Sequence, residues 1–193
     1  MSPIISARGG LSSRGYGQFA ASTAAVDTGS YFPLGAVTVG SAGATSITFS
    51  SIPSTYTHLQ IRCLAKDTTA VAPTFQNFKM TINSNTMTRR HFLYADGSGI
   101  AAGTSTVNLA IGNIPSAGYT SIFGAVIIDI LDYTNTNKNK TIRSLTGTDA
   151  NGSGEIAFYS ALYAVNTNAI TDLSFSTDTS FAQYTSISLY GIK

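Results

Sequence analysis

Few side chains in this sequence could act as nucleophiles or as general acids and bases. The 193 residues include two histidines, His58 and His91, and one cysteine, Cys63. His58 falls in the alternating segment 57–64 and His91 follows two arginines, so we expect both on strand surfaces, away from a nucleophile. Cys63 shares a strand face with apolar residues, where a thiol behaves as a small buried hydrophobic group.

Carboxylates and serines do not complete a catalytic set either. Asp129 and Asp132 could pair as acid and base, but a spacing of three places them on opposite faces of a strand. The segment 96–99, Asp-Gly-Ser-Gly, does not fit the G-x-S-x-G nucleophile elbow. We therefore expect no catalytic residue and no enzymatic activity.

The segment from Asp149 to Glu155 resembles the first half of a calcium loop. Oxygen-bearing residues occupy alternate positions and Gly154 takes the sixth, but the decisive twelfth position is Ser160 where a bidentate Glu is needed. The alternative, a tight hairpin loop, is the one we predict. A single cysteine excludes an intrachain disulfide and a cysteine-based zinc site, so no cofactor or metal is expected.

An asparagine-rich stretch is a candidate for contact with glycans. Aromatic rings stack on sugar faces, while side-chain amides bond to the hydroxyl groups at the sugar edges. The same composition also suits ordinary turns, because Asn readily adopts turn conformations. The candidate glycan-contact residues are Tyr133, Asn135, Asn137 and Asn139.

Residues 1–30 differ from the rest of the chain. They are rich in Gly and other small residues, contain two arginines and show neither strand nor helix periodicity. Such a segment cannot offset its ordering entropy alone, so we predict an extended arm that docks on a neighbouring subunit or on a larger particle. The expected anchors are Arg8, Leu11, Arg14, Tyr16 and Phe19. The arm could instead mimic an arginine-glycine segment that binds nucleic acid, but two arginines and a net charge of +2 argue against that partner.

The elements that must position these residues are short strands separated by turns. Residues 122–131 are apolar on both faces, which predicts a central strand covered on each side. Gly112 to Pro115 is expected to end the strand before it. The pattern predicts about eleven strands in one all-β domain, an antiparallel β-sandwich of the jelly-roll type over residues 31–193. The expected strands are 34–39, 44–49, 57–64, 78–83, 89–95, 104–111, 122–131, 141–148, 155–165, 169–176 and 184–192.

Composition supports the same fold class. Hydrophobic residues make up 43% of the chain and charged residues only 10%, so Ser and Thr supply most of the polar surface. These residues favour strands and turns over helices. The N-terminus lacks the apolar core of a signal peptide and no stretch approaches about 18 apolar residues, so we expect neither a secretory signal nor a membrane span.

Four segments resemble structural proteins of tailed bacteriophages, particularly those of aquatic phages. They are IISARGG (4–10), IPSTYTHLQIR (52–62), DILDYTNTNKNKT (129–141) and LYGIK (189–193). The resemblance implies a non-enzymatic virion component, of the tail-fibre or head-decoration type, that is assembled in the host cytoplasm. Other virion proteins would be its partners, and appendages of this kind commonly form homotrimers.

These observations favour a tail-fibre or other appendage subunit, docked by residues 1–30 and able to contact host surface glycans. A capsid decoration protein that stabilises the head shell is the alternative within the same class. A stand-alone carbohydrate-binding module is the alternative from another class, and an enzyme is a remote third.

Overall fold

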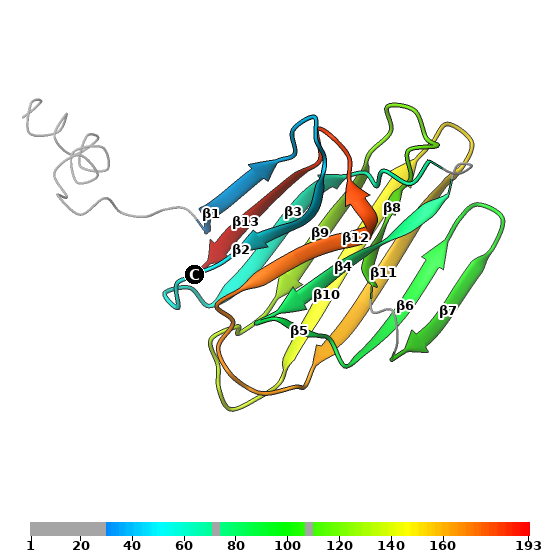
Figure 1. Cartoon of the computed structure of the whole chain (residues 1–193). Coiled ribbons are helices and arrows are strands. Elements are labelled where there is room, and N and C mark those ends of the chain that lie inside the picture. Colours follow the sequence, from blue (N-terminus) through cyan, green and yellow to red (C-terminus); the bar gives the residue numbers. More distant parts are fainter. Residues whose placement is uncertain (1–29, 71–73, 107–109) are drawn as a thin grey trace, which may run out of the picture. The chain divides into compact units, whose positions relative to one another are not determined.

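Thirteen antiparallel strands in two sheets make up the described part of the chain, residues 30–70, 74–106 and 110–193 of a computed structural model (Figure 1). The predicted all-β class is confirmed. The predicted anchors of the arm, Arg8, Leu11, Arg14, Tyr16 and Phe19, lie outside the described residues. The strands are β1 (Tyr31–Thr38), β2 (Ala44–Phe49), β3 (His58–Ala65), β4 (Phe75–Ile82), β5 (Asn85–Thr86), β6 (Arg89–Ala95), β7 (Ile100–Ser105), β8 (Ala110–Pro115), β9 (Gly124–Ile130), β10 (Lys140–Asp149), β11 (Gly154–Tyr163), β12 (Leu173–Phe181) and β13 (Ser186–Ile192).

The strand pairing is nested in the manner of a jelly roll. The first strand pairs with the last (β1 with β13), β2 pairs with β12, β3 with β9 and β4 with β8. Because successive pairs alternate between the sheets, β1, β13, β3 and β9 form half of one sheet, while β2, β12, β4 and β8 belong to the other. The predicted jelly-roll sandwich is therefore confirmed.

Four further strands widen one sheet only. The larger sheet has the order β1-β13-β3-β9-β10-β11-β6-β7, so β10, β11, β6 and β7 continue it beyond β9. In the chain, β5 to β7 lie between β4 and β8, whereas β10 and β11 lie between β9 and β12. Two separate insertions thus meet where β11 pairs with β6, and Figure 1 shows the β6–β7 hairpin at the free edge.

The region around β8 differs from the prediction. The expected strand 104–111 is divided between β7 and β8, and Gly112 to Pro115 continues β8 where a break was predicted. Pro115 is tolerated because it is the last residue of a strand at the sheet edge, opposite Phe75. Gly112 is needed because a Cβ there would lie 2.7 Å from the Thr146 methyl group on β10. The described residues form thirteen strands and not eleven, because the expected strand 104–111 corresponds to two strands and because the two-residue β5 was not predicted.

The core lies between the two sheets. Phe78 stacks in tilted geometry near Phe175 and Phe181, with ring centroids 5.7 and 5.9 Å apart. Ile61 and Ile128 belong to the same buried cluster from the larger sheet, and both are fully buried. Cys63 is buried as predicted, and its burial raises the pKa of the thiol. Aromatic and branched apolar side chains thus join the layers, as in other sandwiches.

Part of the outer face of the larger sheet is exposed and apolar. Residues 122–131 were predicted to be covered on both sides, and this prediction is wrong, because the smaller sheet covers only one face of β9 and Ile127 is 40% exposed. Side chains on successive strands lie opposite one another on this outer side. We call six of them the outer apolar face: Leu93, Ile100, Ile127, Leu145, Ile156 and Phe158.

Candidate functional site: a cleft at one end of the sandwich

A cleft of about 470 Å³ lies between the two sheets at one end of the sandwich. Its lining comes from four places in the chain: the start of β4, the β6–β7 turn, the region of β8 and the β10–β11 hairpin. A second concavity of about 680 Å³ shares Asp96, Ser153, Gly154 and Glu155 with it. The side chains that could bind a ligand in the cleft are Phe75, Asn77, Tyr94, Asp96, Asn113, Tyr119 and Glu155.

Two aromatic rings form one wall of the cleft. Phe75 begins β4 and Tyr119 lies in the loop after β8, and their ring centroids are 5.5 Å apart with a tilt of 34°. The loop is fixed by the Tyr119 amide, which donates to the Ser116 carbonyl at 3.1 Å. The buried Lys66 ammonium donates to the Tyr119 carbonyl, and burial lowers the pKa of this lysine. Both rings are half-buried, so part of each remains available to a ligand.

Two carboxylates of unlike character lie on the other side. Asp96 accepts from the Ser98 hydroxyl at 2.8 Å and from the backbone amide of Gly99 at 2.9 Å, and these bonds lower its pKa. Burial raises the pKa of Glu155; a hydrogen bond from the Asn113 amide opposes this shift, and the negative charge of Asp96 adds to it. The cleft therefore combines a firmly ionised carboxylate with one that takes up a proton more readily.

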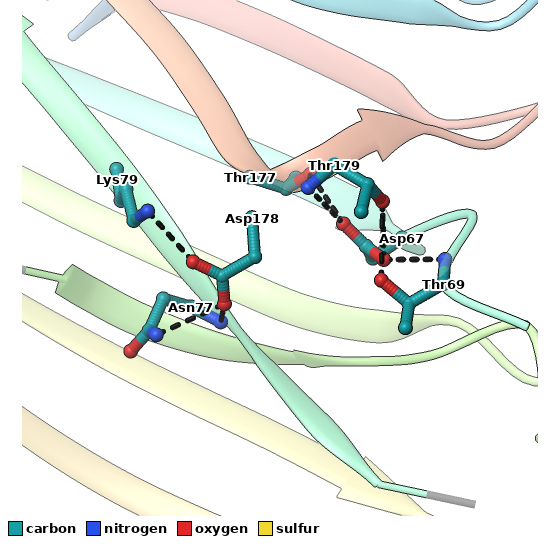
Figure 2. A network of polar contacts seen from close by, with 7 residues as sticks. All are labelled: Asp67, Thr69, Asn77, Lys79, Thr177, Asp178 and Thr179. Atoms are coloured by element: carbon teal, nitrogen blue, oxygen red, sulfur yellow. Dashed lines mark hydrogen bonds and ion pairs between the residues drawn. The ribbon is translucent and has the colours of Figure 1, made fainter. Parts of the chain in front are cut away.

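Asn77 is held in place by Asp178 on the neighbouring strand β12. Asp178 accepts from both the backbone and the side-chain nitrogen of Asn77, each at 2.9 Å, and pairs with Lys79 at 2.6 Å. Burial would raise the pKa of Asp178, but the bonds from Lys79 and Asn77 outweigh it and lower the pKa. Figure 2 shows Asp178 directed toward both β4 residues.

Asp67 fixes the same end of β12 from the other side. Its buried carboxylate accepts from the hydroxyls of Thr177 and Thr179 and from the Thr69 amide at 2.6 Å (Figure 2). Burial alone would raise the pKa of Asp67, yet these hydrogen bonds lower it. Residues 177 and 179 thus point one way while Asp178 points the other, so one stretch of strand supports both clusters.

The predicted glycan-contact loop is only partly available. Tyr133 is fully buried and its hydroxyl donates to the Pro53 carbonyl, so the prediction that its ring meets a sugar is wrong. Asn135 is half-buried, while Asn137 and Asn139 are exposed. Contact between these asparagines and a glycan stays a prediction.

A buried lysine organises that loop from beneath. The Lys140 ammonium donates to the carbonyls of Asn135, Lys138 and Thr167, the last at 3.1 Å. Burial lowers the pKa of Lys140. Nothing in the sequence distinguished this lysine from its neighbour Lys138, which pairs with Asp132 at the surface.

The other residues considered for chemistry have separate structural roles. The predicted hairpin at Asp149 is confirmed, with the Asp149 carboxylate accepting from the Asn151 amide at 2.9 Å. Asp129 accepts from Gln60 at 2.9 Å on the outer face of the sheet. His58 accepts from the Asp132 amide at 3.0 Å, and His91 is exposed on β6.

Within residues 30–70, 74–106 and 110–193, no group of three or more His, Cys, Asp or Glu side chains is placed to hold a metal ion. The same residues include no helix that is long and apolar enough to cross a membrane. A scan against protein-family models, a search of curated proteins and a search of solved structures each return no match to this chain.

Proposed function

We propose that this protein is a non-enzymatic structural subunit of a tailed-phage particle, of the tail-fibre or appendage type, that works by contact with neighbouring subunits. The observation that carries the proposal is the outer apolar face, because a large exposed apolar surface on a folded domain marks an interaction site. A surface with few charges suits the same role, since charged residues are depleted at the centre of protein interfaces.

Three of the four segments that resemble phage structural proteins meet in the fold, while residues 4–10 lie outside the described residues. Residues 52–62 lead into β3, residues 189–193 end β13, and residues 129–141 join β9 to β10. Leu189 lies opposite Ile61, and Leu59 lies opposite Ile130. The resemblance therefore concerns a contiguous block of the larger sheet, which supports a shared architecture better than a shared catalytic site.

In this proposal, residues 1–30 dock the subunit to the particle. Residues 31–193 form a compact unit of their own, so a chain without residues 1–30 should fold with unchanged circular dichroism and thermal stability. It should no longer be incorporated into particles assembled in its presence. Full incorporation of the truncated chain would contradict the docking role.

The place of the subunit on the particle separates an appendage from the alternative, a decoration protein of the head shell. Gold-labelled antibody against the full chain should mark the tail or its fibres in electron micrographs of intact particles. Uniform labelling of the head would favour the decoration role, and unlabelled particles would refute both.

Glycan contact is a second candidate function, and the cleft is the place that favours it. The Phe75–Tyr119 pair offers ring faces, while Asn113 and the two carboxylates offer acceptors and donors for hydroxyl groups. A glycan array probed with the full chain should give signals that Tyr119→Ala removes. Tyr184→Ala, at a 67% exposed tyrosine that does not line the cleft, is the matched control. A blank array would refute this function, and with it the reading as a carbohydrate-binding module.

A further inference from the structure

We propose that the outer apolar face packs against the same face of a second copy of this chain. This inference rests on the contact role proposed above and names both the surface and its partner. The surface belongs to β9, β10, β11, β6 and β7, which are adjacent in the larger sheet.

Strand register makes the face continuous. Ile127 lies opposite Leu145, Leu145 opposite Phe158, and Phe158 opposite Leu93. One row of four large apolar side chains therefore crosses four strands without a polar interruption.

A second row runs beside the first. Gly147 lies opposite Ile156, Ile156 opposite Ala95, and Ala95 opposite Ile100, which is 79% exposed. Because Gly147 and Ala95 are small, the side chains of Ile156 and Ile100 project beyond their neighbours in this row. The two adjacent rows together form a continuous apolar surface.

The two apolar rows are large enough to form the centre of such an interface. Five strands are roughly 24 Å wide, and two outward rows extend roughly 13 Å along the strands, which gives on the order of 320 Å². Each partner contributes about 800 Å² to an interface of standard size, so the polar rows beside the apolar ones, including the row with Asp129 and Arg143, would supply the rim.

The chemistry of the face favours another apolar sheet as its partner. Five of its six members are aliphatic, so it offers one aromatic ring, Phe158, for stacking on a sugar or a base. The neighbouring row carries Asp129 opposite Arg143, and thus both signs of charge, which does not favour an anionic nucleic acid or lipid surface. Two sheets of the same twist pack well face to face, and copies of one chain supply such a pair through a two-fold axis.

Sedimentation velocity of the full chain at increasing concentration tests this inference. We expect a two-copy species whose dissociation constant rises roughly tenfold or more in Leu145→Glu and in Phe158→Glu, because each places a charge at the centre of the interface. Both residues are exposed in the single chain, so the variants should keep the wild-type circular dichroism spectrum. Val165→Glu changes a residue that is similarly exposed (48%) but follows β11 in a loop, and it should associate like the wild type.

A wild-type chain that stays monomeric would overturn the inference and leave the face to a different partner. Association that both Glu variants retain would also overturn it. A three-copy species would exclude the two-fold arrangement and favour the trimer expected from the phage resemblance. Incorporation into particles is measured separately, so a chain that pairs through this face but joins no particle would refute only the proposed function.

Discussion

Asp67 and Thr177 are 110 residues apart in the sequence, yet the Thr177 hydroxyl donates a hydrogen bond to the buried Asp67 carboxylate. The contact joins the segment after β3, in the larger sheet, to β12 in the smaller one. Thr179 adds a second hydroxyl from the same strand at 2.9 Å. A charged group therefore helps to hold the layers together at the end of the sandwich where the cleft opens.

Asp67→Asn should destabilise the domain by about 1–3 kcal/mol, the usual cost of an unsatisfied buried polar group. The backbone amide of Thr69 donates to one Asp67 carboxylate oxygen, and the backbone amide of Thr179 donates to the other. In Asp67→Asn, a side-chain NH2 group replaces one of these oxygens, so one backbone amide loses its acceptor and faces another donor. Urea unfolding measures the change. Asp149→Asn, where one oxygen of an exposed carboxylate is used, is the control and should leave the stability almost unchanged.

Acid should remove the contribution of Asp67. Its folded pKa lies below the unfolded value of about 3.9, so the stabilisation is fully present above that value and is lost as pH falls through the folded pKa. The difference in unfolding free energy between wild type and Asp67→Asn should thus be constant near neutral pH and shrink below about pH 4. A difference that instead grows on acidification would mean that the folded pKa is raised.

Lys140→Met should loosen the loop 131–139. The substitution leaves three carbonyl groups without the buried ammonium that now bonds to them, which should lower the unfolding free energy by about 1–3 kcal/mol. Hydrogen exchange should become faster at Asn135 and Asn137 before it does in the sheets.

Lys138→Met is the matched control for that loop. Lys138 is two residues away and its ion pair is exposed, so its loss should have a much smaller effect on both measurements. Equal effects of the two substitutions would show that the buried bonds are not what orders the loop.

Gly191→Ala should destabilise the domain because Tyr56 packs directly on this residue. A Cβ at position 191 would lie 2.4 Å from the base of the Tyr56 ring, which cannot move away without leaving Phe32. Overpacking of this kind costs about 1–3 kcal/mol, seen as a lower midpoint in thermal unfolding. Gly147→Ala, where a Cβ meets nothing within 4 Å, should fold as stably as the wild type.

Local patterns predict the strands of this protein well because alternation is a local property. The segment 57–64 alternates strictly and matches β3 within one residue, and the turn residues after Asp149 mark the β10–β11 hairpin. The sequence predicts the jelly-roll type of fold but not the individual strand pairs, because local patterns do not indicate which distant strands pair.

Burial on the outer side of a sheet could not be predicted from one strand. Residues 122–131 are apolar on both sides, but whether a second layer covers Ile127 depends on how far the smaller sheet extends. The prediction for Tyr133 is wrong in the opposite sense, because a residue expected to be exposed is buried. Tyr133 follows a strand in a polar, turn-rich stretch, and only the path of the loop shows that its ring enters the core.

The cleft was missed because its residues come from separate segments whose local sequences look like ordinary turns and strand ends. Asp96 and Glu155 are brought together only when the two insertions pair, with Ala95 opposite Ile156. The sequence Thr177-Asp178-Thr179 does indicate something unusual, because it places polar side chains on both faces of one strand, including the face toward the core. It does not indicate the partner of these hydroxyls, Asp67, which lies 110 residues away from Thr177.

The nested pairing of β1 with β13 and of β3 with both β13 and β9 governs how the chain can mature during synthesis. A ribosome releases β3 long before β13 has been synthesised, so one edge of β3 must stay unpaired until Ser186–Ile192 emerges. Deletion of Ser186–Ile192 should therefore leave that edge exposed, and the shortened chain should aggregate where the full chain folds.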